Sequence, residues 1–445
     1  MMQHNGPSRK RAFHNHRELL RHGENLNLRR HRLPGPLPFL NPTRVHVALE
    51  YNQHQGQGAV DAVYYKWTSR NNRKGRHALR LDKSTLEDAR GVQVLRLLPQ
   101  PPGHRSGVAC ALARACCMFP VWDISYLVAL IFTAGRVIWV INGFFVFLPL
   151  IMPSSEFHNE ILSGGGITAF TGATIFEISS ILLMLEAVNE NRTGCFGWAL
   201  SIVLDQHGPN HSSSQPALDG EKSIHMVQLT PKRSTCEHHH ANSRNLVGQD
   251  QHGASTNSEL ENEKSWCWFP SCTQLRTHYA YELGFWACLI QLVAATIFWV
   301  AGFAALPGVH NHMSDGVIDG VYWTPQVVGG LGFVASGFLF MLDTQTHWWK
   351  SALGQLGWHV GAWNMVGGVG FTLSPAFGYD MAATWPQYQA ACSTFWGSWA
   401  FLVGSLLQYY ESLEKHPVEA RRASPKSNMA DQEANLDLNS GECRP

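Results

Sequence analysis

The sequence lacks the short motifs that mark many enzyme active sites. Its 445 residues contain no phosphate-binding glycine loop, no nucleophile elbow around a serine and no zinc-protease histidine pair. We therefore expect a non-enzymatic protein with no catalytic residues and no cofactor. The N-terminal stretch is basic but has no apolar core of roughly 7 to 15 residues behind it, so we expect no cleavable signal peptide.

Charged residues are also scarce in the apolar parts of the chain. The whole sequence is 15% charged with a formal net charge of +1, which hides a very uneven distribution. Six apolar runs each have about the 20 residues that a helix needs to cross a bilayer core of roughly 30 Å. They span residues 124–152, 161–187, 283–306, 321–342, 353–377 and 390–410, and the last four contain no Asp, Glu, Lys or Arg. The sequence predicts an all-α membrane protein with six transmembrane helices.

Lysine and arginine are absent from the three short loops that join these runs in pairs, residues 153–160, 307–320 and 378–389. By contrast, residues 1–119 hold 20 of the 34 Lys and Arg residues and only 7 acidic residues. Because basic loops stay on the cytoplasmic side of a membrane protein, we expect both termini to be cytoplasmic.

The second helix of each pair ends in a similar pattern: two small residues, a run of large apolar or aromatic residues, and an acid. This self-similarity predicts three repeated helical hairpins. Small residues let a neighbouring helix approach closely, and such packing drives helix association in lipid. The three copies contain Ser179, Ser180 and Glu186, then Ser336, Gly337 and Asp343, then Gly404, Ser405 and Glu411.

This pattern resembles the YrhK-like family of small membrane proteins, whose unit is one helix pair with a second helix of the Gly-Ser-x-Leu-Phe type. It is also similar to fungal multi-pass integral membrane proteins. The resemblance covers the apolar runs and not the basic regions. It implies the hairpin architecture and carries no catalytic residue over to this chain.

The predicted domains follow from these patterns. The loop and the tail should be disordered, because they are polar and poor in large apolar residues. The domains are a basic cytoplasmic N-terminal region, 1–119; transmembrane hairpin 1, 120–188; a disordered cytoplasmic loop, 189–278; hairpin 2, 279–350; hairpin 3, 351–412; and a disordered cytoplasmic tail, 413–445.

The N-terminal region has two further features. Residues 44–51 alternate like a β-strand, and residues 60–67 are expected to pair with them. Basic clusters, including Arg73 and Lys74, are expected to contact an anionic lipid leaflet, at about 1 kcal/mol per charge near the membrane. No base-stacking motif accompanies the clusters, so we expect lipids and cytoplasmic proteins as partners and no nucleic acid.

Arg136 and Glu177 are the two charges expected near mid-membrane. Such charges are costly unless they are paired or hydrated, and the two residues lie at similar depths. Both occur only in the first hairpin, where Arg136 aligns with Ala295 and Gly368. The sequence predicts an intramembrane ion pair between them, with an ion or proton pathway as the alternative.

Two other groups of residues are candidates for chemistry. His310, His312, Asp315 and Asp319 share one predicted luminal loop and have ligand types suited to a divalent metal, although we expect them to be solvated loop residues and predict no metal site. Cysteines near the predicted cytoplasmic membrane boundary are candidates for palmitoylation. They are Cys116, Cys117, Cys195, Cys267 and Cys272.

Three hypotheses for function follow. The dominance of packing residues favours a membrane organiser, sensor or scaffold whose basic region recruits lipid or protein partners. The repeats leave a transporter or channel for a small solute or ion as the alternative, although the sequence gives no sign of interrupted half-helices. A luminal metal-dependent membrane enzyme is the third hypothesis and depends on the loop that contains His310.

Overall fold

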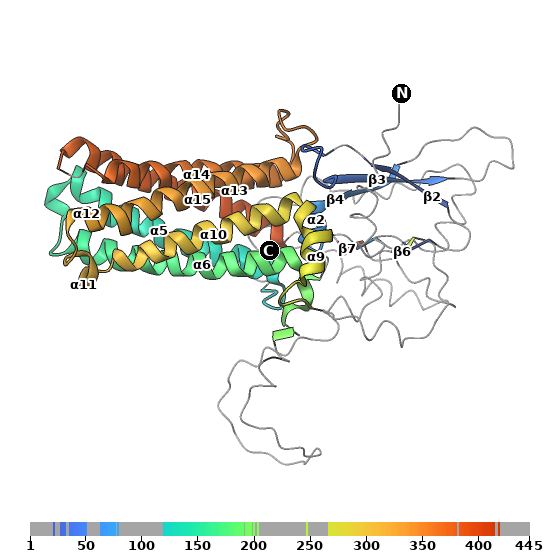
Figure 1. The fold of residues 1–445 in the computed structure, drawn as a ribbon, viewed down its shortest axis with the longest axis horizontal. Coiled ribbons are helices and arrows are strands. Elements are labelled where there is room, and N and C mark those ends of the chain that lie inside the picture. The colour runs from blue at the N-terminus through green and yellow to red at the C-terminus, as the bar shows by residue number, and fades with distance from the viewer. Residues whose placement is uncertain are drawn as a thin grey trace, which may run out of the picture.

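The computed structural model describes residues 21–22, 27–32, 35–50, 63–76, 78–79, 119–190, 192–197, 199–200, 203, 246–247, 266–380, 382–413 and 417–418. Most of these residues are helical, and six long helices run side by side (Figure 1). The six are α5 (Ile124–Ile151), α6 (Gly166–Val188), α10 (Leu283–Ala304), α13 (Thr324–Thr344), α14 (Leu356–Gly378) and α15 (Thr384–Leu413). Each overlaps one of the six predicted apolar runs. Helices α6, α13 and α14 begin later than predicted, and α15 begins earlier.

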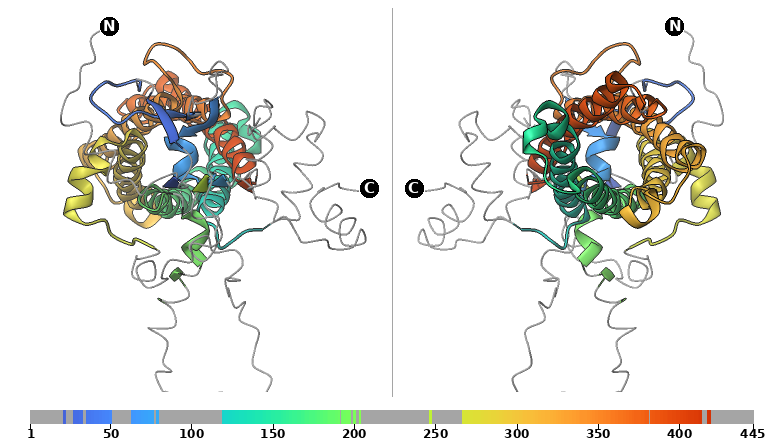
Figure 2. Two further views of the ribbon diagram at one scale, coloured as in Figure 1. Left: turned by 90° about the vertical axis from the view of Figure 1, so that its right-hand side faces the viewer. Right: turned by 90° about the vertical axis from the view of Figure 1, so that its left-hand side faces the viewer.

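The six helices form a closed ring. Each packs against the next in chain order, and α15 also packs against α5, which closes the ring. Figure 2 shows the ring end on, with the short helix α2 (Ser69–Arg73) at the centre of one end. We call this the docking end. There α5, α10 and α14 begin and α6, α13 and α15 end.

The outer face of the ring is apolar, whereas several strongly polar side chains lie inside. Val137, Val293 and Leu331 are exposed on the outside, while Arg136 and Gln291 are buried. This distribution suits a lipid surround better than water. Five of the helices among the described residues are long and apolar enough to cross a membrane. Helix α14 is not among the five, because its polar residues lower its hydropathy.

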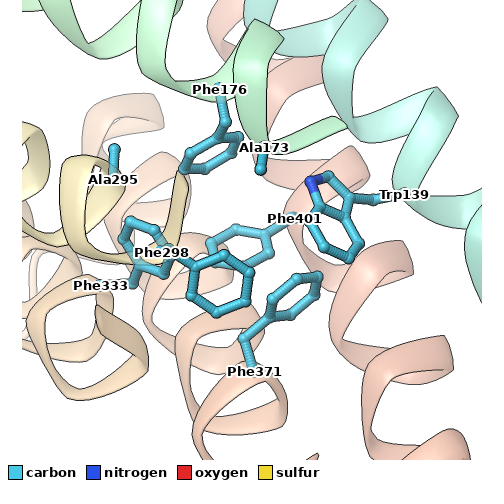
Figure 3. Close-up of a pocket in the computed structure, with 8 residues that line it drawn as sticks. All are labelled: Trp139, Ala173, Phe176, Ala295, Phe298, Phe333, Phe371 and Phe401. Carbon is cyan, nitrogen blue, oxygen red and sulfur yellow. The ribbon is translucent and has the colours of Figure 1, made fainter. Parts of the chain in front are cut away.

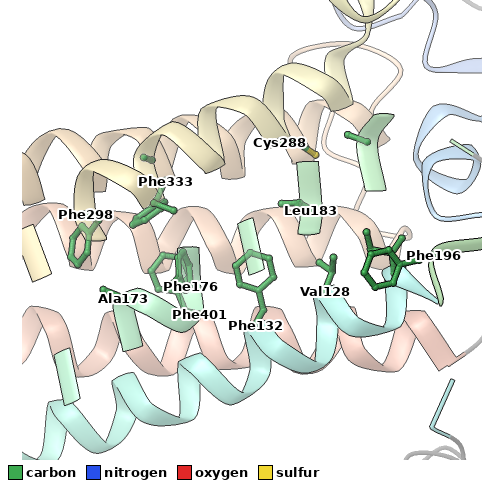
Figure 4. Close-up of a cluster of buried hydrophobic side chains, with 14 of the residues drawn as sticks. Val128, Phe132, Ala173, Phe176, Leu183, Phe196, Cys288, Phe298, Phe333 and Phe401 are labelled. Atoms are coloured by element: carbon green, nitrogen blue, oxygen red, sulfur yellow. The ribbon is translucent and has the colours of Figure 1, made fainter. Parts of the chain in front are cut away.

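An aromatic layer fills the middle of the ring, with one side chain from each long helix (Figure 3). The three that come from α6, α13 and α15 contact one another, with ring centroids between 5.2 and 6.0 Å apart. The free volume left in the layer is about 10 Å³, roughly the room of one water molecule. The layer continues into the apolar core along the ring (Figure 4). Its residues are Trp139, Phe176, Phe298, Phe333, Phe371 and Phe401.

A small antiparallel sheet precedes α2 in the chain. Strands β2 (Asn27–Arg32), β3 (Arg44–Glu50) and β4 (Val63–Thr68) lie in that order. The pairing of β3 with β4 confirms the hairpin predicted for residues 44–51 and 60–67. Helix α2 follows β4 without a loop, so the sheet leads the chain directly to the docking end.

The remaining described elements are short. Two parallel two-residue strand pairs join β1 (Arg21–His22) to β6 (Leu246–Val247) and β5 (Ala78–Leu79) to β7 (Pro417–Val418). The short helical turns are η1 (Pro153–Ser155), η2 (Glu160–Gly165), η3 (Thr193–Cys195), α9 (Cys272–Thr277), η7 (Tyr279–Tyr281), α11 (Pro307–His310), α12 (Asp315–Ile318) and η8 (Asp319–Trp323). Of these, η2 and η8 are π-helical turns that lead into α6 and α13.

The described ends of the loop 189–278 are ordered, which corrects the prediction that the whole loop is disordered. The Asn189 side chain accepts a hydrogen bond from the Cys267 backbone N–H (2.7 Å) and donates to the Cys267 carbonyl (2.8 Å). Phe196 and Trp266 are buried and pack together, with ring centroids 5.5 Å apart. Burial of these large side chains compensates for the polar composition that suggested disorder.

Candidate functional site

Helix α2 is short, and its residue types define both of its ends. The Asn71 backbone N–H donates to the Thr68 hydroxyl (3.3 Å), which caps the N-terminus. Gly75, at φ +62°, follows the C-terminus in the left-handed conformation that favours glycine. Arg70 and the adjacent pair Arg73 and Lys74 are three and four residues apart, so all three lie on one helical face.

Two arginines on this face meet acids from two different helices. The Arg70 guanidinium donates twice to Glu411 of α15, from Nε to Oε1 (3.1 Å) and from Nη2 to Oε2 (2.6 Å). Arg73 Nη2 donates to Asp343 Oδ2 of α13 (3.0 Å). The Ser69 hydroxyl donates to the other oxygen of Asp343. Charge-assisted bonds with this two-point geometry are among the strongest in proteins.

The third cation meets an acid from a third helix. Lys74 Nζ lies 3.4 Å from Glu186 Oε1 of α6. The Ser125 hydroxyl at the start of α5 donates to the same oxygen (3.5 Å). Arg76, just after α2, adds a further bond to Glu411 (3.1 Å). Helix α2 therefore joins the ends of three helices of the ring. We call the three ion pairs, Arg70–Glu411, Arg73–Asp343 and Lys74–Glu186, the docking triad.

The docking triad is almost fully buried. Its exposed fractions run from 0% for Glu186 to 6% for Arg70. Burial alone would lower the pKa of Arg73, but Asp343 beside it raises that pKa above its ordinary value. Burial lowers the pKa of Lys74, and nearby acids, Glu186 foremost, only partly offset the effect. Each charge thus depends on its partner, because water does not solvate it.

Small residues at the starts of three helices leave room for these side chains. A Cβ atom on Gly284 of α10 would collide with the Arg73 guanidinium, and one on Gly357 of α14 would collide with Arg70. Ser125 occupies the second position of α5, as Gly284 and Gly357 do in α10 and α14. The docking end is therefore shaped to admit α2.

Contacts around α2 extend the interface. The Asn41 amide donates to Glu282 Oε1 (2.7 Å), and the Arg44 guanidinium donates to the Thr344 carbonyl. On the other side, the Asn72 amide donates to Glu190 Oε2 (3.0 Å). Arg73 and Lys74, which were expected to contact anionic lipid, are 3% exposed and paired with acids of the ring. Contact of these residues with lipid stays a prediction.

The predicted ion pair between Arg136 and Glu177 is not formed. Arg136 donates from Nη1 to the Phe401 carbonyl (2.8 Å) and from Nη2 to Asn364 Oδ1 (2.6 Å). Glu177 instead accepts a hydrogen bond from the Thr296 hydroxyl of α10 (2.9 Å). The two charges lie at similar depth, but they have different partners.

Helical phase explains why the two charges do not meet. Successive residues of an α-helix are turned by about 100°, and Phe176 occupies the position that faces the ring axis. Its neighbour Glu177 is therefore turned toward α10 at the outer side. Arg136 faces the axis, where the rings of Phe132, Phe176 and Phe401 surround its guanidinium at 4.9 to 5.4 Å. The sequence therefore indicates how deep the two charges lie along their helices, but not the direction in which their side chains point.

The candidate metal ligands do not gather around one point. His310 and His312 each place Nδ1 near a backbone carbonyl, at 3.2 Å from Ala304 O and 3.1 Å from Gly308 O. In the described part of the chain, no three His, Cys, Asp or Glu side chains lie close enough to hold one ion, and Asp315 and Asp319 share no such group with the histidines.

The candidate palmitoylation sites differ in accessibility. Cys116 and Cys117 lie outside the described residues. Cys195 is fully buried in the core, Cys267 is partly buried, and Cys272 is exposed at the start of α9. An acyl transferase needs an accessible thiol, so the packing disfavours Cys195 and leaves Cys272 as the accessible candidate.

The six small residues predicted for helix packing all lie in contacts between or within helices. Ser336 donates to the Ala287 carbonyl of α10 (2.8 Å). A Cβ atom on Gly337 would lie 2.6 Å from the Met365 backbone nitrogen of α14, so these helices touch through backbone. A Cβ atom on Gly404 would lie 3.3 Å from the Trp363 side chain of α14. Ser179, Ser180 and Ser405 are fully buried and donate to carbonyls of their own helices.

Sequence reasoning found the three acids but missed their partners. The signal was present: three closing acids need three cations, and Arg70, Arg73 and Lys74 have the spacing of one helical face. No local pattern marked α2 as a helix, because it has only five residues.

No known protein family, curated protein or solved structure matches this chain. The resemblance to the YrhK-like family stays a prediction, and the docking triad is the basis for a functional proposal.

Proposed function

We propose that this chain is a non-enzymatic, multi-pass membrane sensor and scaffold that works through reversible docking of α2 on its helix ring. The observation that carries the proposal is the docking triad, in which one basic helix face joins three acids from α6, α13 and α15. Such a contact holds the N-terminal segment against the membrane domain and can be broken by competing charge.

Six spans are proposed, with α14 as the sixth. Helix α14 has 23 residues, enough to cross a bilayer core of about 30 Å at 1.5 Å per residue. It lies between α13 and α15 in the ring. Its Asn364 accepts a hydrogen bond from the buried Arg136, and its Ser374 is buried. This placement supports a span whose own hydropathy is low.

Three copies of one hairpin are proposed as the building unit. Phe176, Phe333 and Phe401 each precede a closing acid by ten residues, and all three meet in the aromatic layer. The equal spacing places the three phenylalanines in the aromatic layer and the three acids at the docking end. This agreement at two levels of the ring supports the repeat.

The docking end is proposed to face the cytoplasm. The loops at the opposite end, 153–160, 307–320 and 378–389, contain no Lys or Arg, as expected for the non-cytoplasmic side. The sequons at Asn191 and Asn210 should then stay unglycosylated in cells, and a mobility shift on glycosidase treatment would invert this orientation.

Anionic lipid is the proposed competitor for α2. Each basic residue near an anionic leaflet gains about 1 kcal/mol. When α2 undocks, its cations can exchange ring carboxylates for lipid headgroups and expose the docking end to a cytoplasmic partner. The membrane charge would then set the fraction of α2 that is docked.

Hydrogen exchange in nanodiscs tests this proposal. We expect residues 69–76 to exchange faster in discs that contain phosphatidylserine than in discs of phosphatidylcholine alone. Residues 307–320, at the opposite end and free of Lys and Arg, serve as the internal control and should exchange equally in both. Equal exchange of residues 69–76 in the two lipids would refute regulation by anionic lipid.

A transporter or channel is the second candidate, favoured by a closed ring with buried polar residues on its axis. The aromatic layer opposes this reading, since its free volume of about 10 Å³ leaves no continuous path. Uptake of an ion or solute by proteoliposomes that contain the protein would support transport over sensing.

A further inference from the structure

A second, polar cavity lies inside the ring between α2 and the aromatic layer. Three cations of α2, namely Arg70, Arg73 and Lys74, line one side of it, and Arg136 of α5 lines the other. The free volume is about 20 Å³, enough for one water molecule or one ion of similar size.

Positive charge around this cavity is not balanced. The three α2 cations each have an acid of the ring as partner. Arg136 is 2% exposed, and among the described residues it donates to the neutral oxygens of Phe401 and Asn364. Within the described residues, no acid lies at ion-pair distance from Arg136, and its Nε has no hydrogen-bond partner. One full positive charge is therefore buried without a counter-charge.

The surrounding aromatic rings compensate for only part of this charge. Contact with an aromatic face stabilises a desolvated cation modestly, and three rings surround Arg136. Their faces carry no net charge, so the field of the cation still reaches the cavity. Burial of an uncompensated ion costs a free energy comparable to the stability of a whole domain.

We propose that this cavity binds one small monovalent anion, such as chloride, between Arg136 and the α2 cations. The small free volume favours a monatomic ion over a larger oxyanion such as phosphate. The amides of Gln291 and Gln408 also line the cavity and can donate hydrogen bonds. No carboxylate is among the residues that line it.

The anion deepens the proposed function, and this inference rests on the docking of α2 proposed above. An ion held between Arg136 and α2 attracts both, so it strengthens docking. Chloride binding should therefore favour the docked state, in which the site is complete, over the released state, in which Arg136 faces an open cavity.

Radiolabelled chloride and the purified full-length chain test the proposal. Equilibrium dialysis should give one bound chloride per chain. The Tm should rise as chloride replaces gluconate at constant ionic strength, because a ligand of the folded state stabilises it. Protection of the bonds after Arg70 and Lys74 from trypsin reports α2 docking in the same samples.

Three variants complete the test. Arg136→Met should abolish chloride binding and the dependence of the Tm on chloride. Val360→Leu should do the same by filling the cavity, since Val360 lines it and is 4% exposed, while every charge stays in place. Lys350→Met removes an exposed cation outside the cavity and should leave chloride binding unchanged.

The outcomes separate the two proposals. If α2 is protected from trypsin but the wild type binds no chloride, the cavity holds at most water and the anion proposal fails alone. Chloride binding to Arg136→Met at the wild-type level would also overturn it. If α2 of the wild type is cleaved rapidly in both anions, docking fails and the anion site fails with it.

Discussion

The substitution Asp343→Asn should release α2 from the docking end. Asparagine keeps the shape of the side chain and can still accept the hydrogen bond from the Ser69 hydroxyl. It removes the counter-charge of Arg73, which is 3% exposed and has Asp343 as its ion-pair partner. The variant therefore leaves a cation buried beside a neutral amide.

The expected effect is large. Removal of one partner from a buried pair costs about 3–5 kcal/mol. Since each 1.4 kcal/mol or so is a factor of ten in an equilibrium, the released fraction of α2 should rise roughly a hundredfold to a few thousandfold. Arg70, Arg73 and Lys74 are themselves trypsin sites, and cleavage follows the open population when opening is fast.

Limited trypsin digestion of the purified full-length chain measures this effect, with mass spectrometry to locate the cleaved bonds. Asp315→Asn is the matched control, because it removes an exposed carboxylate at the opposite end of the ring. The double variant Arg73→Met with Asp343→Asn should be cleaved after Arg70 and Lys74 much more slowly than Asp343→Asn, since no buried charge is left unpaired. Wild-type cleavage rates in Asp343→Asn would refute the role of the pair.

Two further predictions follow from the docking end and its surroundings. Gly357→Ala should increase trypsin cleavage in α2, because the added Cβ collides with Arg70. Gly354→Ala is the control, since a Cβ there meets nothing within 4 Å, and it should leave cleavage unchanged. Equal cleavage of the two variants would show that α2 does not pass over Gly357. Maleimide should label the exposed Cys272 of the native protein quickly and the buried Cys195 only after unfolding, and the reverse order would contradict the packing of the loop on the ring.

The helices could be predicted from the sequence because the hydrophobic signal is local. Each long helix covers an apolar run, and Asp123 supplies a recognisable N-cap by accepting from the Ser125 N–H (2.9 Å) at the start of α5. The strand pair β3 and β4 was also evident, since alternation of residues 44–51 is a local pattern. Both inferences use residues that are neighbours in the chain.

Partners that are distant in the chain could not be predicted in the same way. Arg70 and Glu411 are 341 residues apart, and Arg73 and Asp343 are 270 apart. The error at Arg136 has a different origin. Depth follows from counting residues, whereas the direction of a side chain depends on the rotation of the whole helix, which its neighbours in the ring determine.

The ring itself explains why the docking triad is needed. Any bundle in which α6, α13 and α15 end together brings Glu186, Asp343 and Glu411 to one end, where all three are at most 2% exposed. Three buried carboxylates repel one another and lose the water that would stabilise them. Cations from outside the ring neutralise these carboxylates, and α2 supplies three of them on a single helical face. The basic segment before the first span is thus part of the assembly of the bundle, and release of α2 is opposed by the charge left behind on the ring.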